Sequence, residues 1–406
     1  MALAVAEDGE QSIHLFPVLS MRRGVIRTIT VLFADFIAAA VCVELLFQVI
    51  LATPLRWALP VPPVAIYGPD AFTGYRHRAN VSGMWLTEHR AFIRTSNLGL
   101  RDRDRDLARG NGPRAIINGN SFVEALQVEL PHTAAAVAER ILKRDRPNAE
   151  VVNLGLAGAK PAVGVARLES QGLALAPDLA VVVLQADEIA TPSPTDDSEF
   201  TGYRRGADGA FHLSYGFRAS RGYRFRTSVA GSVFYWLLDH SQVARILNAR
   251  KNVGVLAEWP QPAVTPTLTM AAACAPNALD DHVALWIDGR PSEGRATLDA
   301  FIRDLGAVGR KHQLPIIVAT RAIEARCPAL ATKRAALIDA VRATLNAAGL
   351  QFVDLDARVV TKVGRDGLAQ LQGFGPALGR GHLNIDGNRI YGEIYADIIG
   401  EALLRR

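Results

Sequence analysis

Cysteine is scarce in this chain of 406 residues, which contains only Cys42, Cys274 and Cys327. That number excludes a small domain held together by several disulfides and a metal site built on four cysteines. The nine histidines are scattered without the spacing of metal ligands, so the sequence predicts no metal. It contains neither a P-loop nor a G-x-G-x-x-G motif, which argues against a nucleotide-binding protein and predicts no cofactor.

A large excess of one charge is also lacking. The chain has 45 basic and 40 acidic residues, a net charge of +5, which is too small an excess to indicate nucleic-acid binding. The run Arg101–Asp106 (RDRDRD) alternates in sign and neutralises itself, so we expect it to be a solvated surface segment. Because 49% of the residues are apolar, the chain can build a sizeable core.

One long apolar run lies near the start of the chain. It extends from Val31 to Ala52 and is interrupted only by Asp35, Glu44 and Gln48. About 20 apolar residues are enough to cross a bilayer as a helix. The run is too long for a signal peptide and no small-residue cleavage site follows it, so we predict an uncleaved transmembrane anchor over 25–52. The alternative is a buried helix of a soluble protein, which the two acids favour because membrane acids are costly.

Arginines flank the apolar run unequally. Arg22, Arg23 and Arg27 precede it, whereas only Arg56 follows closely. Because positive residues are retained in the cytoplasm, we expect residues 1–24 to form a cytoplasmic tail. The main domain is then periplasmic, attached to the inner membrane by a single span.

This orientation changes the meaning of the cysteines and of Glu44. Cys274 and Cys327 would face an oxidising compartment, where a disulfide between them can persist; the sequence leaves that pairing open. Cys42 lies inside the span. Glu44 either marks the outer water boundary or contacts a membrane partner.

From residue 113 onward, apolar strands alternate with helices of period 3.6. The strands are expected at 114–118, 150–154, 177–184, 314–320 and 351–355, and the helices at 133–144, 161–175, 294–311, 333–348 and the C-terminus. This alternation predicts a parallel sheet with helices on both faces over 113–406. The Pro- and Gly-rich residues 53–112 are predicted to be a lead-in, or linker, with short strands.

An insertion at about 190–290 interrupts the alternation. It contains arginines mixed with aromatic residues at 203–205 and 216–226. Arginine pairs with phosphate and carboxylate and stacks on rings, so the cluster could contact an anionic glycan or lipid headgroups. The alternative, which we favour at this level, is an insertion packed on the main domain with its arginines in solvent.

Candidate chemical groups follow the strands and precede the last helix. In an open α/β sheet, reactive groups collect at the carboxyl ends of the strands. The first strand ends in GlyAsnSerPhe (119–122), the second leads into the glycine-containing loop 153–158, and GlyHisLeuAsn (381–384) precedes the last helix. A serine at such a turn exposes its hydroxyl, and its backbone N–H can help to hold an oxyanion.

With these motifs the sequence resembles the SGNH (GDSL-like) hydrolase superfamily over about 113–190 and 294–406. The resemblance implies a three-layer α/β/α, flavodoxin-like fold and ester chemistry through a Ser–His pair. Ser121 matches the nucleophile and His382 the general base. Gly158 matches the glycine that donates an oxyanion N–H beside that of Ser121.

Three positions depart from the family pattern. The first block reads GlyAsnSer rather than Gly-Asp-Ser, Ala186 stands where an oxyanion Asn is usual, and Gly379 stands where an Asp usually orients the histidine. Loss of one oxyanion donor costs about 10²–10³ in rate, and loss of the orienting acid on the order of 10⁴.

Other residues could replace the missing groups. The replacement donor could come from Gln185 or from the amide of Asn120. A backbone carbonyl near Gly379, or the carboxylate of Asp187, Glu188 or Asp386, could orient the histidine.

Two functions follow from the sequence. The first is a membrane-anchored esterase or O-acyltransferase acting on acyl esters, commonly acetyl, of an extracytoplasmic carbohydrate or on another small ester. The second is a non-catalytic SGNH-like module that binds an envelope glycan or a membrane partner. Ser121, Gly158 and His382 favour the first, and the missing Asp and Asn favour the second.

Overall fold

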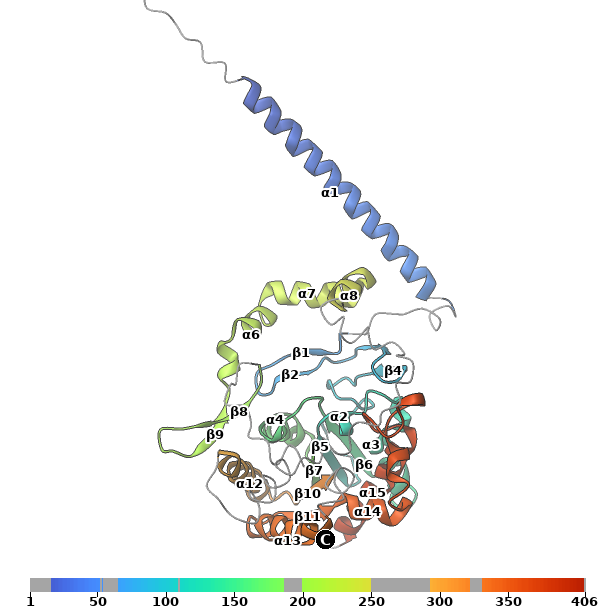
Figure 1. Cartoon of the computed structure of the whole chain (residues 1–406), viewed down its shortest axis with the longest axis vertical. Helices are drawn as coiled ribbons and strands as arrows, with labels where there is room; N and C mark the ends of the chain where they lie inside the picture. The colour runs from blue at the N-terminus through green and yellow to red at the C-terminus, as the bar shows by residue number, and fades with distance from the viewer. Residues whose placement is uncertain are drawn as a thin grey trace, which may run out of the picture.

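A five-stranded parallel sheet forms the centre of the computed structural model (Figure 1). The structure describes residues 16–51, 53, 65–108, 110–185, 199–249, 293–321 and 331–404. Across the sheet the strands are β11 (Gln351–Asp354), β10 (Ile316–Arg321), β7 (Leu179–Gln185), β5 (Arg114–Gly119) and β6 (Glu150–Gly155). Numbered along the chain from β5, this is the flavodoxin-like order 2-1-3-4-5. The predicted α/β/α fold is confirmed.

The sheet is covered on both faces because its strands are apolar on both faces. In β7 all seven residues are buried, and successive side chains point to opposite sides. Ala180, Val182 and Leu184 enter one core, whereas Leu179, Val181 and Val183 enter the other. The first core is closed by α4 (Pro161–Arg167), α12 (Glu293–His312) and α13 (Ala331–Ala347). The second is closed by α3 (Ala134–Leu142), α14 (Leu355–Val363) and α15 (Ile385–Leu404).

The lead-in folds into two antiparallel hairpins. The first consists of β1 (Tyr67–Asp70) and β2 (Gly74–His77), and the second of β3 (Ser82–Trp85) and β4 (Ala91–Arg94). Both lie on the side of the main domain that faces α7 in Figure 1.

The alternating run after these hairpins is not the solvated surface that its sequence predicts. Arg101, Asp102 and Arg105 are at most 5% exposed. Arg105 lies 2.9 Å from Asp102 and 2.6 Å from Glu139 on α3, and Arg101 donates to the carbonyl of Val128 at 2.7 Å. Asp104 and Asp106 are exposed, whereas these three buried residues have polar partners inside the protein and join the lead-in to the main domain.

A 36-residue helix, α1 (Phe16–Leu51), precedes the domain. The most apolar 18-residue window within its segment Ile26–Ile50 has a mean hydropathy of 2.3, and none of that window is buried, so the segment is long and apolar enough to cross a membrane. A signal sequence would meet the same criterion. Cys42 lies exposed on this helix. The disulfide candidates Cys274 and Cys327 lie outside the described residues.

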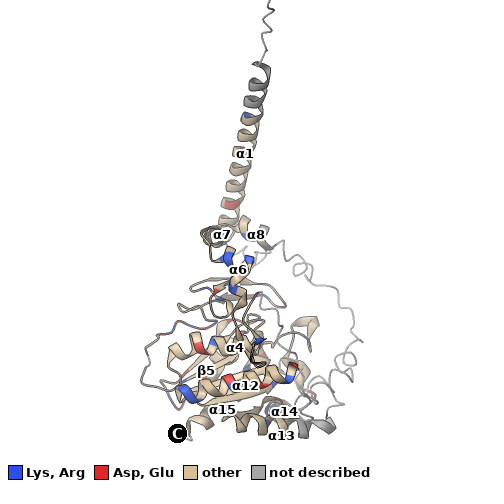
Figure 2. Ribbon diagram, turned by 90° about the vertical axis from the view of Figure 1, so that its left-hand side faces the viewer, with Lys and Arg blue, Asp and Glu red and all other residues tan. Residues whose placement is uncertain are grey.

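The described part of the insertion contains a small hairpin and three helices. They are β8 (Gly202–Arg205), β9 (Phe211–Ser214), α6 (Arg221–Arg226), α7 (Val229–His240) and α8 (Gln242–Ala249). Helices α7 and α8 lie at the foot of α1 (Figure 2). Glu44 Oε2 accepts hydrogen bonds from the Ser241 hydroxyl at 2.9 Å and the Val243 N–H at 3.0 Å. Glu44 thus contacts the N-terminus of α8 in the same chain.

Candidate active site

Ser121 lies at the turn between β5 and the short helix α2 (Ser121–Glu124). Asn120 caps this helix, because its side-chain oxygen accepts from the Phe122 N–H at 3.1 Å. From the neighbouring strand, the Asn153 amide donates to the Val123 carbonyl at 2.9 Å. These bonds hold the serine at the carboxyl end of the central sheet.

His382 precedes α15 and contacts the serine hydroxyl. Its Nε2 lies 2.8 Å from Ser121 Oγ, although the two residues are 261 positions apart. Its Nδ1 lies 2.7 Å from Oε1 of Glu88, and its backbone N–H donates to Oε2 of Glu88 at 2.8 Å. Ser121, His382 and Glu88 therefore form a continuous Ser–His–Glu chain of hydrogen bonds.

The hydrogen-bond partners of His382 determine which of its two ring nitrogens carries the hydrogen when the ring is neutral. An ionised carboxylate only accepts hydrogen bonds, so Nδ1 of His382 carries the hydrogen that Glu88 accepts. Nε2 then presents its lone pair to the hydroxyl of Ser121. This is the tautomer in which a histidine can accept the proton of a nucleophilic serine.

Glu88 occupies the tip of the β3–β4 hairpin. Its φ of 65° lies in the left-handed region, which is uncommon for a residue with a side chain and is maintained by its surroundings. The next residue, His89, stacks on Phe374 at 4.3 Å between ring centroids, and its Nδ1 lies 3.1 Å from the carbonyl of Gln127. Contacts on the main domain thus hold the hairpin tip against His382.

Gly381 leaves room for this carboxylate. A Cβ at this position would lie 2.6 Å from Oε2 of Glu88, and the φ of 76° also favours glycine. Partial burial raises the pKa of the Glu88 carboxyl, but the hydrogen bonds from the His382 ring and N–H lower it by a larger amount. The net pKa is therefore below the ordinary value. Glu88 is therefore ionised at neutral pH.

Aromatic and cationic side chains support the imidazole from behind. The ring of Phe122 lies 4.8 Å from that of His382, and the guanidinium of Arg321 lies 3.6 Å from the Phe122 centroid. Arg321 ends β10, is 2% exposed and lies 3.4 Å from the Tyr391 hydroxyl. This stack restricts the movement of His382 away from Ser121.

The loop after β6 brings Gly158 to the same edge of the sheet. The Leu156 N–H donates to the Gly119 carbonyl at 2.9 Å, which aligns this loop with the turn that carries Ser121. Among the described residues, neither the Ser121 N–H nor the Gly158 N–H has a hydrogen-bond acceptor. Both amides are available for an oxyanion, as the family resemblance implies.

Tyr75 holds the peptide unit that carries the Gly158 N–H. Its hydroxyl donates to the carbonyl of Ala157, and burial raises its pKa, so the phenol remains a donor. In a trans peptide the C=O and the following N–H point in opposite directions. A hydrogen bond to the Ala157 oxygen therefore orients the Gly158 N–H on the other side.

We expect Tyr75→Phe to lower kcat by about 10-fold to 100-fold with little change in KM, because a displaced oxyanion donor weakens the transition state more than the bound ester. The phenyl ring retains the contacts of Tyr75 with Tyr67 and Phe200, whose ring centroids lie 5.7 and 6.4 Å away. Steady-state kinetics on an aryl acetate measure the effect. An unchanged kcat would show that the Gly158 amide needs no such support.

The remaining predicted site residues have other surroundings. Gln185 is buried at the end of β7, beside Arg321 in the sheet register. Asn120 uses its oxygen to cap α2. Asp386 is 72% exposed and lies 3.6 Å from Arg389, so the carboxylate at His382 is Glu88 and not Asp386. Ala186, Asp187 and Glu188 lie outside the described residues.

A buried polar network lies behind Ser121 on the other side of α2. Glu124 accepts from the Tyr67 hydroxyl at 2.8 Å and contacts the His77 ring, whose Nδ1 lies 3.5 Å from Arg167. His77, Glu124, Arg167 and Arg101 are all at most 1% exposed. Burial lowers the pKa of both arginines to about 10, and the charge of Glu124 opposes this shift. The network joins the first lead-in hairpin to the helix that carries the serine.

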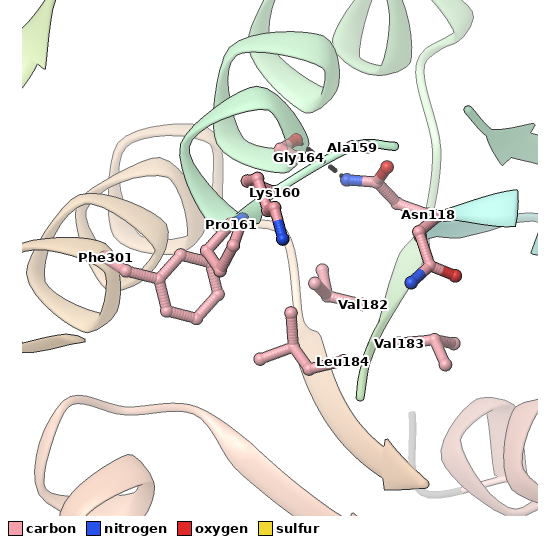
Figure 3. Close-up of a pocket in the computed structure, with 11 residues that line it drawn as sticks. Asn118, Ala159, Lys160, Pro161, Gly164, Val182, Val183, Leu184 and Phe301 are labelled. Carbon is pink, nitrogen blue, oxygen red and sulfur yellow. Dashed lines mark hydrogen bonds between the residues drawn. The ribbon is translucent and has the colours of Figure 1, made fainter. Parts of the chain in front are cut away.

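A pocket lies beside the turn that carries the serine (Figure 3). It is lined by Asn118, Gly119, Asn120, Ala159, Lys160, Pro161, Gly164, Val182, Val183, Leu184 and Phe301. The Asn118 amide donates to the Gly164 carbonyl at 2.8 Å across its upper edge in this view. The lining is mostly apolar, with Asn118, Asn120 and Lys160 as its polar members.

No protein-family model and no curated protein matches this sequence. Among solved structures, it is similar to a protein from Desulfitobacterium hafniense described as lipolytic and of the G-D-S-L family (10% identity, TM-score 0.34, covering 70% of this chain and 98% of that one). It is also similar to a lipase/acylhydrolase from Enterococcus faecalis (14% identity, TM-score 0.34, covering 71% of this chain and 96% of that one). A third similar structure is a catalytic mutant of an acetylxylan esterase from Geobacillus stearothermophilus (14% identity, TM-score 0.36, covering 72% of this chain and 96% of that one).

These proteins are esterase-type hydrolases of the kind that the motifs around Ser121 and His382 resemble.

Proposed function

We propose that the protein is a serine esterase or O-acyltransferase of the SGNH type, attached to the outer face of the cytoplasmic membrane by α1. The observation that carries this proposal is the Ser121–His382–Glu88 chain, with heavy-atom distances of 2.8 and 2.7 Å. The sequence alone left an inactive module open because Gly379 replaces the usual acid and Ala186 the usual oxyanion Asn. A carboxylate from another part of the chain answers the first of these objections.

The geometry supports a two-step acyl transfer. The oxygen of Ser121 attacks the acyl carbon as its proton passes to Nε2 of His382, and the carbonyl oxygen becomes an oxyanion facing the amides of Ser121 and Gly158. The ester C–O bond then breaks, and the leaving alcohol takes the proton from His382. Glu88 stabilises the imidazolium while it exists.

A second nucleophile completes the reaction. Water, or a hydroxyl of an acceptor, gives its proton to His382 and attacks the acyl-serine, which releases Ser121 with its proton restored. Water makes the protein an esterase and a glycan hydroxyl makes it an acyltransferase. The resemblance to SGNH hydrolases favours acyl, commonly acetyl, esters of an extracytoplasmic carbohydrate as substrates.

Active-site labelling tests this proposal. The full chain in detergent micelles is treated with a fluorophosphonate probe, and acetate release from an aryl acetate is followed in parallel. We expect Ser121→Ala to abolish labelling and turnover and His382→Ala to reduce both strongly, while Ser82→Ala on the exposed side of β3 leaves them unchanged.

Each other outcome has a defined meaning. A folded wild-type protein that neither labels nor turns over would support the non-catalytic glycan-binding or partner-binding module instead. Labelling with little hydrolysis would point to a transferase, and addition of an oligosaccharide acceptor with free hydroxyl groups would then restore turnover, measured as release of the aryl alcohol.

A further inference from the structure

Helices α6 and α7 present an apolar surface to solvent. Phe225, Val229, Val233, Trp236 and Leu237 have exposed fractions of 50, 82, 52, 57 and 42%. In α7 the exposed positions recur at three- and four-residue intervals, so they share one face of the helix. The other large exposed apolar residues described outside α1 are scattered over the domain, and exposed patches of this kind mark interaction surfaces.

The opposite side of α7 is attached to the domain. Leu238 is 2% exposed, and Arg78 of the lead-in pairs with Asp239 and lies 5.1 Å from the ring centroid of Tyr235. Ser228 caps the helix by accepting from the Gly231 N–H at 3.2 Å. The apolar face therefore points away from the domain in a defined orientation, and we call these five residues the α6–α7 face.

The α6–α7 face lies next to the predicted membrane span. Helix α8 packs on α1, and Glu44 binds Ser241 and Val243 at the junction of α7 and α8. Figures 1 and 2 both place α7 and α8 between the catalytic domain and the body of α1. A membrane crossed by α1 would thus have its outer surface at the level of α7.

The charges of this region match a phospholipid surface. Residues 216–240 contain four arginines and a single acid, Asp239, which is paired with Arg78. Arg221 and Arg224 on α6 are exposed, and Figure 2 shows basic positions, in blue, along α6. Tryptophan beside arginines and aliphatic residues is the usual composition of an interfacial helix, with the ring at headgroup depth and the cations on phosphates.

We propose that α6 and α7 lie on the outer surface of the membrane, with the α6–α7 face inserted among the lipids and Arg221 and Arg224 on lipid phosphates. This inference rests on the proposed membrane span. It adds a second membrane contact, which would stop the catalytic domain from rotating about a single helix. The active site would then have a fixed height and orientation above the bilayer.

Quenching by brominated lipids tests the position of Trp236. The full chain is reconstituted in nanodiscs, one copy per disc, with phospholipids carrying bromine on the acyl chains near the headgroup or with unbrominated lipids. The difference in fluorescence between wild type and Trp236→Phe isolates Trp236 from the other four tryptophans. We expect this component to be quenched by brominated lipid, whereas the corresponding difference for Trp85→Phe, in β3, is not.

Two exposed positions provide a variant that preserves the fold. Val229→Asp combined with Val233→Asp places charges on the α6–α7 face without removing buried contacts, and we expect it to abolish the lipid quenching of Trp236. An unquenched Trp236 in the wild type, or quenching unaffected by the two aspartates, would overturn the proposal. A Trp236 that is unquenched by lipid and also shielded from aqueous iodide would be covered by the chain itself, which likewise overturns the proposal.

Failure of this proposal can be separated from failure of the anchor and of the esterase. Resistance of the full chain to alkaline carbonate extraction reports membrane integration through α1, and fluorophosphonate labelling reports the active site. A chain that resists extraction and labels, but whose Trp236 is unquenched, refutes the surface contact alone.

Discussion

Replacement of Glu88 by glutamine is expected to lower kcat by about 10³-fold to 10⁴-fold, with KM changed little. Glutamine keeps the size of the side chain, but it removes the negative charge that stabilises the imidazolium of His382. Its NH₂ group can also favour the wrong tautomer, in which Nε2 carries the hydrogen and cannot accept the proton of Ser121. Initial rates with an aryl acetate, at matched amounts of folded protein, measure the loss.

Glu129→Gln is a matched control for Glu88→Gln. Glu129 is exposed, and the same substitution there removes a charge without touching His382, so we expect wild-type kinetics. Retained activity in Glu88→Gln would show that another group orients the imidazole and would remove Glu88 from the proposed mechanism.

The pH dependence of activity should reflect the lowered pKa of Glu88. The folded-state pKa of Glu88 lies below the ordinary value of a glutamate, because the hydrogen bonds from His382 outweigh the effect of burial. Glu88 therefore stays ionised to lower pH than an ordinary glutamate, and its contribution to the rate is lost only as the pH falls through that lowered pKa. Any titration observed nearer neutrality should persist in Glu88→Gln, at the reduced rate.

Replacement of Glu124 by glutamine is expected to lower the free energy of unfolding by about 3–5 kcal/mol. Two arginines, Arg101 and Arg167, are completely buried. Among nearby charges, that of Glu124 does most to keep both of them protonated. Without it, both guanidinium groups lose their strongest compensating charge, and burial then favours their neutral forms even more. Arg167 Nε and Nη1 already have no hydrogen-bond partner among the described residues, so little else can compensate.

Thermal or denaturant unfolding of the full chain, followed by circular dichroism in micelles, tests this effect. Glu401→Gln is the control: Glu401 pairs with Arg358 at 3.0 Å on the surface, and its loss should cost at most about 1 kcal/mol. Equal effects of the two substitutions would mean that the buried network contributes no more than a surface ion pair.

Much of the fold was predictable from local patterns. The fully apolar run around Leu179–Gln185 requires burial on both faces, and its alternation with amphipathic helices predicts a parallel sheet. The sequence also predicted Ser121, Gly158 and His382 as site residues, because each lies at the end of a strand or the start of a helix, and such positions meet at one edge of an α/β sheet. These features depend on residues close to one another in the chain.

Glu88 was not predictable in this way. It is 294 residues from His382, in a lead-in whose turns resemble ordinary surface loops. Only the position of the β3–β4 hairpin, held by His89 and given room by Gly381, brings its carboxylate to the ring. A signal existed in the missing family acid, which predicted that some other group must orient His382, but not which one.

Contacts between distant segments also decide the burial within the Arg101–Asp106 run and the exposure of the α6–α7 face. The alternating charges of Arg101–Asp106 indicate a solvated run as long as each residue is judged with its neighbours, yet Arg105 is buried against Glu139 on α3. Likewise, the α6–α7 face is apolar in sequence, but its exposure beside α1 is decided by how its other side packs. The sequence by itself determined which segments become strands or helices and which residues lie at their ends, because periodicity and turn preference are local. The partners of buried charges and the exposed faces were decided by tertiary structure, because these depend on contacts between distant segments.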